Sequence, residues 1–192
     1  LFGYIFGTSS SKGTTAVSQY DSSLYWKFYI PSSLKTVVIT DETIIGYGAF
    51  YNCSWLESVT MPECVTSIGY NAFYNTKLLN DRPEGLVIVD NCLVKYKGTC
   101  TGEVVVPDGV RVVAGGAFYN CSGLTSVTIP SSLTGIGEVA FGWCSGLRSV
   151  TIPEGVRDIG DSAFEGCSGL MSVTIPSSVT SIGYHAFYGC NS

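Results

Sequence analysis

Histidine and positive charge are scarce in this sequence, and their scarcity excludes several kinds of function. His185 is the single histidine, and 10 Lys and Arg residues stand against 15 Asp and Glu in a chain whose net charge is -5. A nucleic-acid backbone requires a basic stripe, so we expect no nucleic-acid partner, and an anionic membrane surface is disfavoured for the same reason. One histidine also removes most nucleophile–base pairs, so we expect no enzyme.

Long apolar runs are also missing, and with them any expected transmembrane segment, which would need about 20 consecutive apolar residues. Residues 1–7 lack the basic stretch of a signal peptide, and the sequence does not begin with Met. Residues 189–192 stop where a further repeat would start. We therefore expect this chain to be a fragment of a longer protein.

Repetition is what the sequence has in abundance. The dipeptide Ala-Phe recurs in steps of 23 residues with a single step of 45, at Ala49-Phe50, Ala72-Phe73, Ala117-Phe118, Ala140-Phe141, Ala163-Phe164 and Ala186-Phe187. A fixed period of about 20–50 residues is typical of repeat architectures, whose coils contact only their neighbours. The period predicts one solenoid of 23-residue coils.

Each regular repeat predicts a short strand, two corners and a buried aromatic ring. Its pattern is Leu-x-x-Val-Thr-Ile-Pro, a turn, Val-x-x-Ile-Gly, two variable residues, and Ala-Phe-x-x-Cys. Strand alternation places Val59 and Met61 on the buried face and Ser58 and Thr60 on the outer face. We expect Pro to end each strand, Gly to permit the backbone geometry of a second corner, and the six Phe rings to form one stacked ladder.

Two segments depart from the regular pattern. Residues 1–29 form a Gly/Ser/Thr-rich and aromatic-rich leader that we expect to be irregular, with a flexible loop at 8–13, and the solenoid covers residues 30–192. Between about residues 80 and 106, the segments 86–89 and 92–96 resemble two strands around an Asp-Asn turn. This region predicts a hairpin-like insertion that interrupts the stack without ending it.

The full repeat pattern, most complete at residues 170–190, resembles the BspA-like (Treponema-type) leucine-rich repeats. The resemblance implies a β-rich, right-handed stack with one short parallel strand per coil and turns, short 3-10 segments or short strands on the convex side. It implies a secreted or cell-surface protein of a bacterium or an anaerobic protist, noncatalytic and without a cofactor, acting in adhesion or protein recognition. Departures from the pattern are Thr76 in a Cys position, Cys64 in place of Ser or Gly, and a one-residue deletion near Thr40.

The eight cysteines fall into two groups. Five recur at the same place in the repeat, which predicts small apolar core fillers: Cys53, Cys121, Cys144, Cys167 and Cys190. Cys92 and Cys100 flank a loop and are the pair best suited to a disulfide, with two free thiols as the alternative. Cys64 lies in a turn, where we expect a free thiol.

No metal site is expected from the sequence. Zinc needs clustered His, Cys or carboxylate ligands, whereas the cysteines lie one per coil and His185 occupies a variable, solvated slot. Asp158, Asp161 and Glu165 gather in one coil and could bind calcium. They lack a dedicated loop pattern, so a solvated acidic face is the favoured interpretation.

Two sets of residues remain as candidate interaction sites. The first is the outward strand face, made of Ser58, Thr60, Ser126, Thr128, Ser149, Thr151, Ser172 and Thr174. Such a flat, neutral face suits broad contact, although strand propensity alone also explains the Thr residues. The second is the residue after Ala-Phe, which is Tyr51, Tyr74, Tyr119 or Tyr188 and suits either an interface or packing between coils.

These observations favour a noncatalytic module for interaction and adhesion, whose partner is a protein, a host-surface component or a glycan. The alternative is a rigid structural spacer that displays other domains of a larger surface protein. A regular Ser-x-Thr array could also order water or ice. By resemblance we expect an extracellular or cell-surface location.

Overall fold

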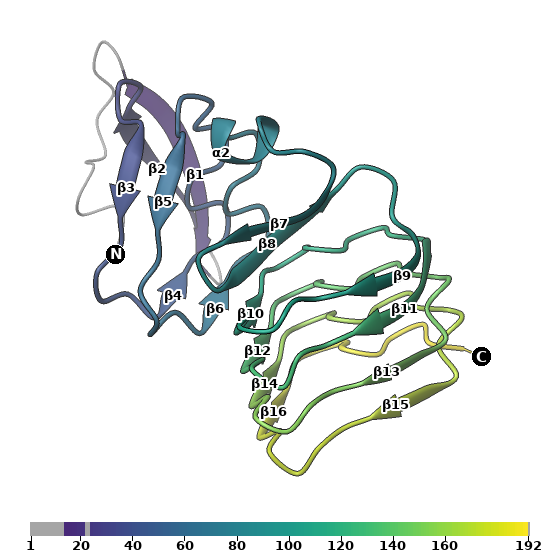
Figure 1. Cartoon of the computed structure of the whole chain (residues 1–192). Helices are drawn as coiled ribbons and strands as arrows, with labels where there is room; N and C mark the ends of the chain where they lie inside the picture. Colours follow the sequence, from purple (N-terminus) through teal and green to yellow (C-terminus); the bar gives the residue numbers. More distant parts are fainter. Residues whose placement is uncertain (1–13, 22–23, 192) are drawn as a thin grey trace.

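The chain folds as two stacks of short-stranded coils joined by a two-stranded hairpin (Figure 1). The computed structural model describes residues 14–21 and 24–191, with side chains from Tyr29 onward. The loop expected at residues 8–13 lies outside the described residues. The predicted solenoid is confirmed, and helix in the described part is limited to the single turn α2 (Lys77–Asn80).

The described part of the leader is a strand pair. β1 (Thr14–Asp21) pairs antiparallel with β2 (Leu24–Pro31) over their full lengths. The sequence predicts an irregular segment here, and the structure differs because residues 24–30 are rich in the aromatic and β-branched residues that favour strands. The β1–β2 pair lies beside the first stack (Figure 1).

Two sides of each coil carry short parallel strands, and the third carries turns. The first side contains the Ser-Val-Thr segments, in the pairs β3 (Thr36–Val38) with β5 (Ser58–Thr60), β9 (Thr101–Val105) with β11 (Gly123–Thr128), and β13 (Ser149–Thr151) with β15 (Ser172–Thr174). The second side contains two-residue strands: β4 (Ile44–Ile45) with β6 (Ser67–Ile68), then β10 (Val112–Val113), β12 (Gly135–Ile136), β14 (Asp158–Ile159) and β16 (Ser181–Ile182) in order. The Ala-Phe-x-x-Cys segments form the turns of the third side.

The expected hairpin is present as β7 (Gly85–Val89) and β8 (Cys92–Lys97), and β8 pairs with β10. Its side chains alternate between two separate hydrophobic cores. Val87 and Val94 pack in the core of the first stack, whereas Leu93 packs in the core of the second. Burial on both faces explains why the hairpin strands are nearly continuous apolar runs.

The Phe rings stack within each core but not across the hairpin. Phe50 and Phe73 have centroids 5.4 Å apart, and the second stack contains a near-parallel ladder with spacings of 4.9, 5.1 and 5.3 Å, made of Phe118, Phe141, Phe164 and Phe187. Tyr96 of β8 lies 5.8 Å from Phe118, at the position that Phe73 would hold in a continuous ladder. The prediction of one ladder of six is therefore wrong, because the hairpin inserts its own ring.

Close approach between coils, and not the predicted corner geometry, requires the glycine after Ile. A Cβ added at Gly69, Gly137 or Gly160 would lie 2.5–2.6 Å from a backbone nitrogen of the preceding coil. The left-handed backbone occurs two positions later, with φ between 53° and 64° at Gly48, Asn71, Gly116, Val139, Ser162 and His185. A β-branched residue is rarely found there, so Val139 carries local strain.

Candidate interaction surfaces

The outward strand face is a flat surface of small hydroxyl side chains. Seven of its eight predicted residues are exposed and Ser126 is half-buried: Ser58, Thr60, Thr128, Ser149, Thr151, Ser172 and Thr174 are the exposed ones. The valines between them point inward, with Val59 5% exposed and Val150 2% exposed, so the predicted alternation is confirmed. Pairing places like residues side by side, as in Ser149 with Ser172.

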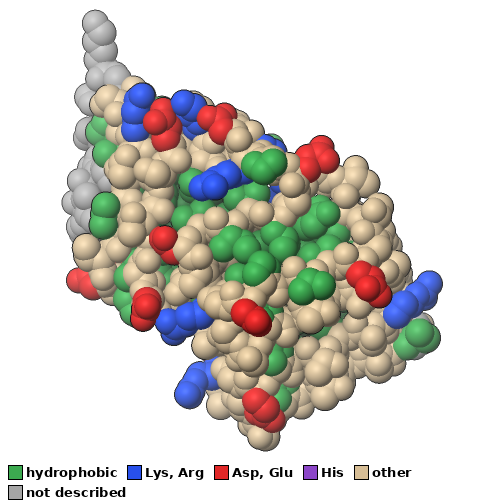
Figure 2. Space-filling view, in the orientation of Figure 1, with side chains coloured by type: hydrophobic (Ala, Val, Ile, Leu, Met, Phe, Trp, Pro, Cys, Tyr) green, Lys and Arg blue, Asp and Glu red, His purple; other side chains and the backbone are tan. Residues whose placement is uncertain are grey.

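Charge is nearly absent from the strands of this face. Glu103 is the single charged residue within β3, β5, β9, β11, β13 and β15. Val38 and Val105, each 64% exposed, add methyl groups to the hydroxyls. Figure 2 shows the area over β11, β13 and β15 as largely uncharged. A partner on this face would therefore meet hydroxyl and methyl groups.

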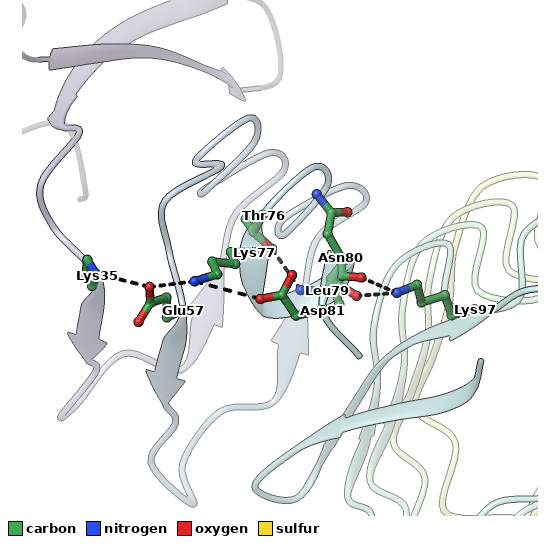
Figure 3. A network of polar contacts seen from close by, with 8 residues as sticks. All are labelled: Lys35, Glu57, Thr76, Lys77, Leu79, Asn80, Asp81 and Lys97. Atoms are coloured by element: carbon green, nitrogen blue, oxygen red, sulfur yellow. Dashed lines mark hydrogen bonds and ion pairs between the residues drawn. The ribbon is translucent and has the colours of Figure 1, made fainter. Parts of the chain in front are cut away.

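A small charged network borders the face at the first stack (Figure 3). Glu57 Oε1 lies 2.9 Å from Lys77 Nζ and 3.3 Å from Lys35 Nζ. The hydrogen bonds from Lys77 and Lys35 lower the pKa of the Glu57 carboxyl. These groups are exposed, so the network contributes little to stability and instead marks the charged edge of the neutral face.

The structure does not bring the four predicted tyrosines into one row. Tyr51 and Tyr74 stack with centroids 5.1 Å apart on the first stack. Tyr119 contacts Tyr70 edge-to-face at 5.8 Å, across the junction of the two stacks. Tyr188 is 63% exposed and lies 4.7 Å from the ring of His185 in the last coil. Each is accessible, but they belong to separate aromatic groups.

Trp143 is an exposed aromatic that the sequence analysis missed. Its side chain is 51% exposed, and its backbone φ is 62°, the left-handed value shared by Asn120 in the preceding coil. A Cβ at Gly166 would lie 2.9 Å from the Trp143 ring, so the ring lies over the following coil. The available signal was a Trp in a slot that Asn or Gly fills in the other coils.

All eight cysteines are free thiols, including the two predicted as a disulfide pair. Cys92 and Cys100 do not pair because Cys92 packs in the first core, whereas Cys100 packs in the second core and hydrogen-bonds with Cys121. Three thiols of the repeat donate to a Phe carbonyl of the preceding coil: Cys144 Sγ to Phe118 O at 3.2 Å, Cys167 Sγ to Phe141 O at 3.1 Å and Cys190 Sγ to Phe164 O at 3.3 Å. Burial raises the pKa of the Cys53, Cys92 and Cys121 thiols to about 12.

The histidine and the acidic residues that were considered as metal ligands do not form one cluster. His185 is exposed and stacks between Tyr184 and Tyr188, at 3.8 and 4.7 Å. Asp161 Oδ1 accepts from Tyr184 N at 2.7 Å, which gives this carboxylate a structural partner. Over residues 14–21 and 24–191, no three His, Cys, Asp or Glu side chains group as metal ligands would. Helices long and apolar enough to cross a membrane are likewise not found in the described chain.

The repeat matches a known sequence family over almost its whole length. The model described as BspA type leucine rich repeat region matches residues 5–82 and 88–192, in six copies. A search of curated proteins gives no match.

The chain is also similar to solved structures of bacterial proteins. A leucine-rich cell surface protein from Faecalibacterium prausnitzii A2-165 is 27% identical, with a TM-score of 0.48 over 82% of this chain and 58% of that one. The T. pallidum leucine-rich repeat protein is 29% identical, with a TM-score of 0.46 over 83% of this chain and 64% of that one. Pneumococcal vaccine antigen PcpA is 20% identical, with a TM-score of 0.53 over 82% of this chain and 49% of that one. This chain spans about half to two thirds of their lengths.

Proposed function

Because the chain belongs to the BspA-type leucine-rich repeat family, we propose that it is a noncatalytic module for protein interaction or adhesion at the cell surface or outside the cell. The proposed contact surface is the outward strand face. Its partner is a protein or a host-surface component, including a surface glycan.

The observation that carries this proposal is the exposure and uniformity of the strand face. Its hydroxyl side chains serve little internal purpose, because Ser58 with Thr36 is the one bond between face side chains in the described chain, at 3.1 Å. The core is formed without them, since the inward-facing valines Val59, Val127 and Val150 of the same strands are buried. A flat face with few charges supports broad contact over several coils and offers no enclosed pocket for a small molecule.

Adding positive charge to this face tests the proposal. The triple variant Thr128→Lys, Thr151→Lys and Thr174→Lys places three ammonium groups on neighbouring coils, and each side chain is exposed, so the fold should tolerate them. We expect adhesion of the protein to fall by at least about tenfold, because a desolvated like-charge cluster costs several kcal/mol at an interface.

The matched control carries the same added charge away from the face. Ser131→Lys, Ser145→Lys and Ser177→Lys change three exposed serines outside the strands. Adhesion should survive in this control. If both triple variants adhere as strongly as the unchanged protein, the strand face is not the contact surface.

A rigid spacer is the second candidate function, and the continuity of the second stack favours it. Backbone hydrogen bonds join consecutive coils on the third side, for example Phe118 N to Ala140 O at 2.8 Å and Phe141 N to Ala163 O at 2.7 Å. If the chain is a spacer, the protein should keep its adhesion when every strand-face residue is changed, provided that the length of the stack is preserved.

A further inference from the structure

A cavity of about 290 Å³ lies where the hairpin separates the two stacks. Its walls come from the second coil, from α2, from β7 and β8, and from Ala114 and Gly115 of the next coil, whose Gly115 N donates to Ile68 O at 2.7 Å. We call it the hairpin cleft. Its apolar wall includes Phe73, Leu79, Val87 and Val94. Hydrophobic side chains also gather over the β7–β8 region on the face shown in Figure 2.

Three backbone N–H groups at the hairpin cleft have lost their usual acceptors. Elsewhere the third side of one coil donates to carbonyl oxygens of the next, as Phe50 N does to Ala72 O at 2.7 Å. By the repeat, Phe73 N should donate to Ala117 O, but that oxygen accepts from Tyr96 N of β8 at 2.8 Å. Within the part of the chain that the structure describes, the N–H groups of Asn71, Phe73 and Asn75 have no protein acceptor, and all three residues line the cleft.

Cationic groups border the same cleft. Lys95 lines it and donates from Nζ to Gly116 O at 2.8 Å. Lys97 also lines it and donates to Leu79 O at 3.0 Å and to Asn80 O at the end of α2 (Figure 3). It donates to Arg82 O as well. No Asp or Glu is among the described residues that line the cleft. Lys97 spends its three N–H donors on these carbonyls, so the donors left for a ligand are the three backbone N–H groups and the two remaining N–H groups of Lys95. The cleft therefore combines free donors with positive charge, and it suits a ligand that supplies acceptors.

We propose that the hairpin cleft binds a small organic carboxylate. Its oxygens take the place of the carbonyl oxygens that a directly following coil would supply to Asn71, Phe73 and Asn75, and its hydrocarbon part lies on Val87 and Val94. The volume lies just below the range of about 300–1,000 Å³ for ligand pockets, so one small acid or the last residue of a peptide fits. Hydrogen bonds from backbone N–H and ammonium groups to a carboxylate are charge-assisted, and they are about twice as strong as bonds between neutral groups.

Amide NMR spectra of the ¹⁵N-labelled chain test this site with three probes. N-acetyl-L-leucine and 4-methylpentanoate carry the carboxylate, and N-acetyl-L-leucinamide lacks it. We expect saturable shifts of the Asn71, Phe73 and Asn75 amides with N-acetyl-L-leucine and none with the amide. Matching shifts with 4-methylpentanoate would show that a free acid suffices, whereas shifts with N-acetyl-L-leucine alone would assign the site to a peptide carboxyl terminus.

A pair of lysine variants tests the contribution of charge. Lys95→Gln should weaken N-acetyl-L-leucine binding by about tenfold, the usual effect of losing one charged hydrogen-bond partner. Lys35→Gln, outside the cleft and paired with Glu57, should leave binding unchanged. The proposal is overturned if neither acid gives saturable shifts, if the amide shifts the same residues equally, or if Lys95→Gln binds as tightly as Lys35→Gln.

Discussion

At the scale of single residues, the cysteine thiols differ sharply in their access to solvent. Cys64 is exposed, and its Sγ lies 3.6 Å from Glu42 O. Cys53, Cys92 and Cys144 are fully buried. Burial holds the pKa of the Cys53 and Cys92 thiols at about 12, compared with an ordinary value of 9.0. Reactivity belongs to the thiolate, so burial suppresses it both by limiting access and by keeping these thiols protonated.

Alkylation of the native chain should therefore select Cys64. With iodoacetamide at pH 8, we expect rapid modification of Cys64, slow modification of the half-buried Cys190, and protection of the buried cysteines until denaturant is added. The selectivity should persist as the pH rises past 9, because the raised pKa values keep Cys53, Cys92 and Cys121 protonated until the pH nears 12. Mass spectrometry of peptides gives the order of modification. Early modification of Cys92 together with Cys100 in the folded chain would contradict the burial described above.

The recurrence of cysteine was enough to predict the buried thiols, since a 23-residue spacing identifies one slot per coil. It could not decide the pairing of Cys92 with Cys100. Those two residues lie near each other in sequence, but β8 ends at Lys97 and the chain then turns, so that Cys92 packs in the first core and Cys100 in the second. The path of the chain after β8 cannot be read from cysteine spacing.

At the scale of the element, close contact between coils explains the glycine that follows the second-side strand of a coil. Gly160 lies so close to the preceding coil that an added Cβ would be 2.6 Å from Glu138 N. Gly46 holds the same place in the first regular coil and has nothing within 4 Å of an added Cβ. The two glycines share one sequence position and differ only in having a coil packed beneath them.

The variants Gly160→Ala and Gly46→Ala should therefore differ in stability. We expect Gly160→Ala to lower the free energy of unfolding by about 1–3 kcal/mol, because backbone atoms must move to admit the methyl group. Gly46→Ala should be close to neutral, since its site is open and its φ is not left-handed. Urea denaturation measures both, and equal losses in the two variants would show that corner geometry, as the sequence suggested, sets the requirement.

Strand patterning was the most predictable feature of the elements, and coil adjacency the least. Val59 and Ser58 were correctly assigned to opposite faces from alternation alone. The single ladder of six Phe rings was wrong because periodicity identifies equivalent positions without stating which coils touch. Tyr96, which replaces Phe73 as the neighbour of Phe118, lies outside the repeat and so had no predicted role.

At the scale of the whole molecule, the β7–β8 hairpin lies between two hydrophobic cores and contacts both. It contributes to both cores, adds two strands to the second-side sheet and takes the Ala117 carbonyl that would otherwise bond to the second coil. Asp90 at its turn accepts from Met61 N at 2.7 Å, which satisfies one donor of the interrupted first side. The 45-residue step in the Ala-Phe spacing locates this insertion, but the donors left open at the hairpin cleft follow only from the three-dimensional path.

The two proposed binding surfaces follow from opposite properties of the molecule. The strand face is regular, neutral and extended over many coils, which favours a macromolecular partner. The hairpin cleft is irregular, cationic and small, which favours a single carboxylate group. Each therefore has its own test, and the failure of one leaves the other standing.

Hydrogen exchange of the Phe amides most directly tests the central structural claim, that the hairpin replaces one contact between coils. Phe50, Phe118 and Phe141 donate to the following coil at 2.7–2.8 Å, whereas Phe73 has no acceptor in the described chain. We predict slow exchange at the first three amides and rapid exchange at Phe73, although all four Phe side chains are buried. Protection of Phe73 equal to that of Phe118 would mean that the third side of the second coil bonds directly to the third side of the next coil, which would contradict both the position of the hairpin and the hairpin cleft.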